Sequence, residues 1–168
     1  GPKRPESRVF EDLQVAVHGQ GFATAQVTED LSASYPEPVR GLLNIGLLHT
    51  ALSGLPGHAP YAPTDVRALV ARGYDYWALG HVHQREVVHQ APHVVFPGNL
   101  QARHVRETGA KGATLVRVED GAIRSLEHRS LDVVRFAQLT VSAEGASSLA
   151  DVADLAKATF TRALSEAE

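Results

Sequence analysis

Two short apolar stretches that end in histidine limit most strongly how this 168-residue chain can fold. The first spans residues 42–48 and is followed by His49. The second spans residues 74–79 and runs into the sequence Gly-His-Val-His at 80–83. Continuous apolar runs of this length are typical of strands that are buried on both faces of a sheet. We therefore expect two buried strands, each with imidazoles at its carboxyl end.

A helix is predicted between these two strands, because Thr64 or Asp65 can cap its start and Gly73 can close it. A strand, a helix and a strand in succession are typical of a unit whose two strands run parallel. Parallel strands end at the same edge of their sheet, and α/β proteins usually bind ligands at that edge. The glycines and prolines of residues 50–58 predict a loop at its rim.

The rest of the chain predicts shorter elements. Residues 1–13 are expected to be an irregular lead-in, and residues 22–40 to be mostly loop with one helical turn near 28–32. The Asp-Gly pair at 120–121 predicts a β-hairpin. The remaining predicted strands cover residues 13–20, 86–88, 93–96, 113–118, 123–128 and 135–141.

An alanine-rich helix is predicted from Leu149 to the end of the chain. Its apolar stripe comprises Leu149, Val152, Ala153, Ala156, Phe160 and Leu164. One strand and one helix cannot bury this stripe between themselves, so we expect residues 134–168 to begin a second domain. The chain contains no methionine, which also indicates a piece of a longer protein.

The chain contains no cysteine, so any metal must be held by nitrogen and oxygen ligands. No apolar run approaches the roughly 20 residues of a membrane span, and we expect a soluble protein with no membrane partner. The net charge is −3, yet residues 81–130 carry seven basic and five acidic residues. The basic ones include Arg85, Arg103, Arg106 and Lys111, which could face phosphate or simply be solvated.

Neutral imidazole is the commonest side-chain ligand for divalent transition metals, and a His-x-His pair brings two imidazoles within reach of one ion or two neighbouring ions. His81 and His83 are therefore candidate ligands, with His49 as a third nitrogen. The alternative is that these histidines are structural and hydrogen-bonded to backbone. Among the other six histidines, only His104 is singled out, because it follows Arg103 just after a Pro-Gly-Asn turn.

The order of three short motifs resembles the C-terminal half of the catalytic domain of calcineurin-like metallophosphoesterases. These motifs are Gly-Leu-Leu-His-Thr at 46–50, Ala-Leu-Gly-His-Val-His at 78–83 and Phe-Pro-Gly-Asn at 96–99. The resemblance covers about residues 8–135 and is in particular to the DNA-repair exonuclease branch, the SbcD and YhaO-like proteins. It implies an α/β fold that is part of a two-sheet sandwich, with four layers in the order αββα. Residues 1–133 would belong to that catalytic domain, and residues 134–168 would start a capping domain.

The resemblance also implies a ligand set and a reaction. His49 and His81 would bind one divalent ion and His83 a second, with manganese as the usual metal, and a metal-activated water would attack a phosphodiester. The implied function is a DNA exonuclease acting in DNA repair in the cytoplasm, with DNA and an SbcC-like ATPase as partners. The candidate substrate-binding residues near this site are Asn99, Arg103 and His104.

Three further motifs of the family do not occur in this chain, namely Asp-x-His, Gly-Asp, and Gly-Asn-His followed by Asp or Glu. In the family they supply a bridging aspartate, an asparagine ligand and a histidine that can act as general acid. Three neutral imidazoles hold two dications poorly without a carboxylate. We therefore expect the chain to be inactive alone, with or without bound metal.

Two alternative functions stay open. One keeps the fold and the metal chemistry but changes the substrate to a phosphomonoester or a small-molecule phosphodiester such as a cyclic nucleotide. The other is a non-catalytic interaction module whose histidines are structural. Metal binding distinguishes the interaction module from the two enzymes. Salt-dependent DNA binding distinguishes the nuclease from a phosphatase or small-molecule phosphodiesterase.

Overall fold

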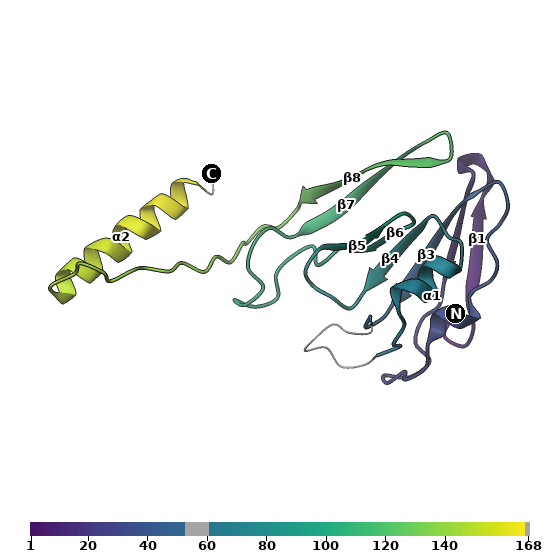
Figure 1. Ribbon diagram of the computed structural model, residues 1–168, viewed down its shortest axis with the longest axis horizontal. Helices are drawn as coiled ribbons and strands as arrows, with labels where there is room; N and C mark the ends of the chain where they lie inside the picture. Colours follow the sequence, from purple (N-terminus) through teal and green to yellow (C-terminus); the bar gives the residue numbers. More distant parts are fainter. Residues whose placement is uncertain (53–60, 167–168) are drawn as a thin grey trace.

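A computed structural model describes residues 1–52 and 61–166 of the chain. Figure 1 shows a large sheet, a separate β-hairpin and a C-terminal helix. The architecture of the described ranges is mixed α/β, with a six-stranded sheet and a second, two-stranded sheet. Most of the loop predicted at 50–58 lies outside the described residues, and so does His58.

The large sheet has a parallel centre and an antiparallel strand at each edge. Its order is β1-β2-β3-β4-β6-β5, and the pairs from β2 to β6 run parallel. The antiparallel edge pairs are β1 with β2 and β5 with β6, and the second has an irregular register between Val87 and His89. The strands are β1 Glu6–Phe10, β2 Val15–Gly19, β3 Leu43–His49, β4 Tyr76–Gly80, β5 Glu86–Gln90 and β6 His93–Phe96.

The predicted parallel pair is confirmed. β3 and β4 are connected through the helix α1 (Val66–Ala71), and their register sets His49 opposite Gly80. The Asp65 carboxylate caps α1 by accepting a hydrogen bond from the Ala68 amide at 2.8 Å. The two apolar runs and the cap between them therefore located this unit correctly from the sequence.

The core lies on one face of the sheet, where it is covered by α1 and the 3-10 helix η2 (Leu31–Ser34). Trp77 is fully buried there, and its Nε1 donates a hydrogen bond to the Leu69 carbonyl at 3.0 Å. Its ring also stacks on Tyr74, with ring centroids 5.0 Å apart. A Cβ added at Gly46 would lie 2.8 Å from Trp77 Cδ2 and nearer still to two other ring carbons. The buried indole thus requires glycine at that position of β3.

The opposite face of the sheet is apolar and partly open. Successive side chains of a strand alternate between the two faces, so one set of residues from β2 and β3 lies on this side. Val15, Val17 and Ile45 are half-buried, and Leu47 is 45% exposed. Sheets of parallel strands are normally covered on both faces, so this face is suited to packing against a further layer.

The prediction of a lead-in over residues 1–13 was wrong from Glu6 onward. β1 forms an edge strand, and the chain turns back into β2 through the 3-10 helix η1 (Glu11–Leu13). All residues of β1 are exposed, so the strand leaves no hydrophobic pattern in the sequence. The helical turn predicted near 28–32 forms slightly later as η2, where the Asp30 carboxylate accepts a hydrogen bond from the Ser32 amide.

The strand predicted at 135–141 was also wrong. No strand of the described chain pairs with this segment, and alternation of side chains alone cannot form a ladder. The backbone there bonds to the preceding loop instead. The Gly109 amide donates to the Phe136 carbonyl at 3.0 Å, and the Gln101 side chain bonds the backbone of Val133 and Val134.

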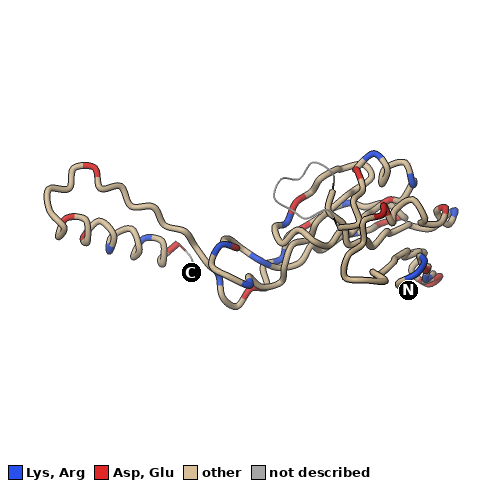
Figure 2. Tube along the Cα trace, turned by 90° about the horizontal axis from the view of Figure 1, so that it is seen from below, with Lys and Arg blue, Asp and Glu red and all other residues tan. Residues whose placement is uncertain are grey.

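The hairpin and the C-terminal helix are confirmed. β7 (Gly112–Glu119) and β8 (Ala122–Ser130) pair around the Asp-Gly turn, and α2 spans Leu149–Ser165 behind a capping box of Ser148 and Asp151. Figures 1 and 2, turned by 90°, both show α2 away from the sheet at the end of an extended segment. None of its described residues is buried, so the predicted apolar stripe is exposed.

No helix in the described part of the chain is long and apolar enough to cross a membrane.

The contact between Gly46 and Trp77 predicts a stability effect. Gly46→Ala should lower the free energy of unfolding by about 1–3 kcal/mol, because the new methyl group overlaps a ring that cannot move within the core. Gly21→Ala is the matched control, since nothing lies within 4 Å of a Cβ there, and it should change stability by less than about 0.5 kcal/mol. Urea unfolding measures both, and equal midpoints would contradict the packing described here.

Candidate functional site

One open pocket of about 540 Å³ brings together the histidines that the sequence singles out. It lies where β3 and β4 end, and its wall includes residues between β6 and β7. The lining residues are His49, His81, Val82, His83, Gln84, His104, Arg106, Glu107 and Lys111. The structure therefore places the three predicted metal ligands, and His104, around one pocket.

His49 and His81 are neighbours because their strands are paired in parallel. Their ring centroids are 5.3 Å apart, and the ring planes are inclined by 80°. A Cβ at Gly80 would lie 2.9 Å from His49 Nδ1. The His49 ring therefore fits beside β4 only because Gly80, which precedes the His81/His83 pair, has no side chain.

Two aromatic rings flank this histidine pair. Phe22 packs edge-on against His49 with centroids 5.4 Å apart, and Tyr61 packs against His81 at 5.9 Å. Partial burial, and then the nearby charge of His83, lower the pKa of His49 below its usual value of 6.5. His49 is therefore neutral at neutral pH, which is the form of imidazole that binds a metal.

The backbone at His81 has an unusual conformation. Its φ of 113° lies in the region that favours glycine. Holding a residue with a Cβ in such a conformation costs on the order of 1–3 kcal/mol, and such residues cluster at functional sites. A strained histidine at the end of the central strand is therefore an independent reason to place function at this pocket.

A carboxylate that the sequence analysis did not identify also lines the pocket. Glu107 Oε1 lies 2.6 Å from His83 Nδ1 and 3.5 Å from His104 Nε2. Glu107 Oε2 accepts a hydrogen bond from the Arg103 amide at 2.8 Å and from Asn99 Nδ2 at 3.3 Å. The Arg103 amide first, and the His83 ring second, lower the pKa of Glu107 to about 2.

One signal in the sequence could have found Glu107. It is the only acidic residue between Glu86 and Glu119, a stretch that also contains Arg103, Arg106 and Lys111. Asn99 and Arg103, predicted to bind substrate, both bond to Glu107 and are not among the residues that line the pocket.

Two cationic side chains also line the pocket. Arg106 is exposed, whereas Lys111 is only 3% exposed. Lys111 Nζ donates a hydrogen bond to Gln84 Oε1 at 3.2 Å, so its described side-chain partner is neutral. Cationic side chains that line a pocket attract anions to it. The presence of Arg106 and Lys111 therefore makes the pocket suited to phosphate.

The donor chemistry suits a divalent transition metal, but the donors present do not complete a site. Four imidazoles and a carboxylate around one pocket are the nitrogen and oxygen ligands that such ions accept. Among the described residues, however, no group of three or more histidine, aspartate or glutamate side chains is arranged to hold an ion. These residues fit one side of a metal centre.

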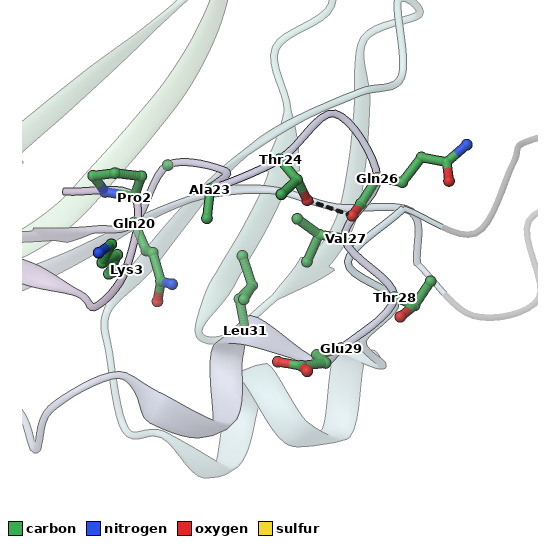
Figure 3. A pocket seen from close by; sticks show the side chains of 11 residues that line it. Pro2, Lys3, Gln20, Ala23, Thr24, Gln26, Val27, Thr28, Glu29 and Leu31 are labelled. Atoms are coloured by element: carbon green, nitrogen blue, oxygen red, sulfur yellow. Dashed lines mark hydrogen bonds between the residues drawn. The ribbon is translucent and has the colours of Figure 1, made fainter.

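Other polar features of the chain make weaker candidates. Figure 3 shows a hollow near the N-terminus whose charged lining residues are Lys3 and Glu29, with no imidazole. His18, which the sequence left unassigned, is fully buried and structural, since its ring bonds Ser7 Oγ at 2.7 Å and Asn44 Oδ1 at 3.1 Å. The histidine pocket therefore remains the candidate functional site.

Comparison with known proteins gives one informative match. No family model matches the chain. The chain is 37% identical over 162 residues to the uncharacterized metallophosphoesterase YhaO of Bacillus subtilis (strain 168). The alignment covers 94% of this chain and 40% of that protein, so the chain spans less than half of the relative's length. Over most of its length, the chain is therefore similar to part of a metallophosphoesterase.

The backbone at His81 predicts different stabilities for two variants that both lack the imidazole. His81→Gly should be more stable than His81→Ala by about 1–2 kcal/mol, because only alanine keeps the Cβ that strains this conformation. Both variants lose the contacts of the imidazole ring, so the difference between their free energies of unfolding reports the strain in the backbone alone. Chemical unfolding of both measures it, and an alanine variant as stable as the glycine variant would contradict the strain.

Proposed function

We propose that this chain supplies the histidine side of the active site of a two-metal phosphodiesterase that acts on DNA. The observation that carries the proposal is the shared pocket of His49, His81 and His83 at the ends of two parallel strands. The similarity to a metallophosphoesterase supports the same chemistry. In this proposal residues 1–133 are the C-terminal half of the catalytic domain, and residues 134–168 begin a capping domain.

The open face of the sheet supports the proposed domain organisation. Val17, Ile45 and Leu47 form an apolar surface that a second sheet could cover, as in a two-sheet sandwich. The exposed apolar residues of α2, among them Phe160 at 61%, need a similar cover from a capping domain. Both surfaces are what an incomplete enzyme would leave uncovered.

In this proposal His49 and His81 hold one divalent ion and His83 holds a second, with manganese as the proposed metal. Such ions, when bound, activate water and stabilise the charge that develops on the phosphate. Lys111 and Arg106 attract the phosphate group to the same pocket. Neutral imidazoles alone do not balance two dications, so we propose that the chain is inactive by itself and that carboxylates from the rest of the protein complete the site.

The proposal extends to the biological role. It assigns the intact protein an exonuclease function in DNA repair in the cytoplasm, with an SbcC-like ATPase as partner. The basic segment around the pocket is the feature of this chain that supports a polyanionic substrate.

Metal binding and catalysis test the proposal together. The full-length protein should bind Mn²⁺ and hydrolyse a phosphodiester such as bis-p-nitrophenyl phosphate. His81→Ala and His83→Ala should each lower Mn²⁺ affinity and activity by at least about 100-fold, since even the loss of a residue that supports a ligand costs 10- to 100-fold. His128→Ala, on β8, is the control and should change neither. A wild type that binds Mn²⁺ no better than the two variants would exclude the metalloenzyme and favour an interaction module.

DNA binding tests the substrate. Binding of duplex DNA by the full-length protein should weaken steeply with salt, and Arg106→Gln should reduce the slope of log K against log salt by about 1, the loss of one phosphate contact. Arg117→Gln, an exposed arginine on β7, should leave the slope unchanged. Weak binding that does not respond to salt would favour a phosphatase or a small-molecule phosphodiesterase.

A further inference from the structure

The Glu107 carboxylate lies at the centre of the loop between β6 and β7. Its side chain is 11% exposed, which is low for a glutamate outside a regular element. The Arg103 amide and the Asn99 side chain both donate to Oε2. The two oxygens therefore have different roles, because Oε2 is held by the loop while Oε1 is directed at the histidines.

The shortest contact of Glu107 is the one to His83. The distance of 2.6 Å between Oε1 and Nδ1 is that of a strong hydrogen bond, whereas His104 Nε2 is 3.5 Å from the same oxygen. His83 is thus the principal partner of this carboxylate. A contact this short requires the proton to lie between Nδ1 and Oε1.

The same loop also fixes the backbone of His83. The Asn99 amide donates a hydrogen bond to the His83 carbonyl at 3.2 Å. Gly98 has a φ of 78°, and a Cβ there would lie 3.0 Å from that carbonyl oxygen and 2.9 Å from the Arg85 amide nitrogen. The Pro-Gly-Asn turn therefore packs directly on the chain at His83, and Glu107 holds the ring that this backbone carries.

The chemistry of imidazole gives this arrangement a function. A neutral ring carries its proton on one nitrogen, and the other nitrogen then has the lone pair that a metal can bind. A carboxylate that accepts from Nδ1–H keeps the proton there and leaves Nε2 as the donor. Metal-binding histidines commonly have such a partner, which sets both the tautomer and the orientation of the ring.

We propose that Glu107 is a positioning residue, which holds His83 in the Nδ1–H tautomer with Nε2 as its metal-binding atom. The tautomer and the orientation follow from contacts within this chain, whereas the use of Nε2 rests on the proposed function. Asn99 and Arg103 then act on His83 indirectly, because their hydrogen bonds orient the Glu107 carboxylate, which in turn orients the His83 ring.

Ring nitrogen NMR of the chain tests the tautomer without any metal. Two-bond ¹H–¹⁵N correlations, recorded at a pH above which the His83 signals no longer move, should show His83 protonated at Nδ1 in the wild type. Glu107→Ala should shift His83 to the Nε2–H form, which imidazole side chains prefer in water. Glu107→Gln keeps the side-chain size but should also shift His83 to the Nε2–H form, because its single amide oxygen accepts from Arg103 and Asn99 and its NH2 group then faces Nδ1. Glu127→Gln, an exposed glutamate on β8, is the matched control and should leave His83 unchanged.

Two NMR results would overturn the proposal. One is a wild-type His83 that is protonated at Nε2, and the other is a Glu107→Ala spectrum in which the His83 tautomer is the same as in the wild type. Wild-type chemical shifts elsewhere in the spectrum of each Glu107 variant would show that its fold is intact and that the tautomer change is local.

Metal affinity of the full-length protein gives a second, separate readout. Glu107→Ala should weaken Mn²⁺ binding by about 10- to 100-fold, and Glu107→Gln, which keeps the size but lacks the second acceptor, should weaken it similarly. Equal affinity in the wild type and both variants would overturn the role of Glu107. If the wild type bound no Mn²⁺, the proposed function would fail, and the NMR result would still decide whether Glu107 sets the tautomer.

Discussion

The parallel pairing of β3 with β4 is the constraint on which both the core and the site depend. Its register sets His49 opposite Gly80, so that two imidazoles meet at the strand ends. The same ladder sets Gly46 opposite Trp77, whose indole then anchors α1 through a hydrogen bond to the backbone of that helix. A shift of one residue would separate the histidines and place the indole on the wrong face.

The parts of the fold that could be predicted are those whose buried residues form a continuous apolar pattern in the sequence. β3, α1 and β4 were found because their apolar runs and the cap at Asp65 depend on neighbouring residues in the chain. β1 could not be found, because an exposed edge strand is formed by its backbone bonds to β2 and not by its side chains. The error at 135–141 has the opposite cause, since a strand-like pattern there has no partner to pair with.

The candidate site divides in the same way. The three histidines were placed from spacing alone, because each follows a strand end that the apolar pattern marks, although their role as ligands stays a prediction. Glu107 lies 24 residues from His83 and reaches it only because the loop before β7 folds back over the strand ends. No pattern among neighbouring residues in the sequence predicts that the loop folds back in this way. Asn99 was located near the site, but its observed partners, Glu107 and the backbone of His83, show how indirect its contribution can be.

The two outer strands of the large sheet differ from its centre in a way that affects association. β1 carries Glu6 and Arg8 along its length, and β5 combines Glu86 with an irregular register at 87–89. Charges and bulges at the rim of a sheet discourage the addition of a strand from another molecule. Exposed apolar side chains also lie on the open face of the sheet and on α2, for example Leu47 and Phe160. Growth into fibrils by edge pairing is therefore disfavoured, while contacts between broad faces stay available.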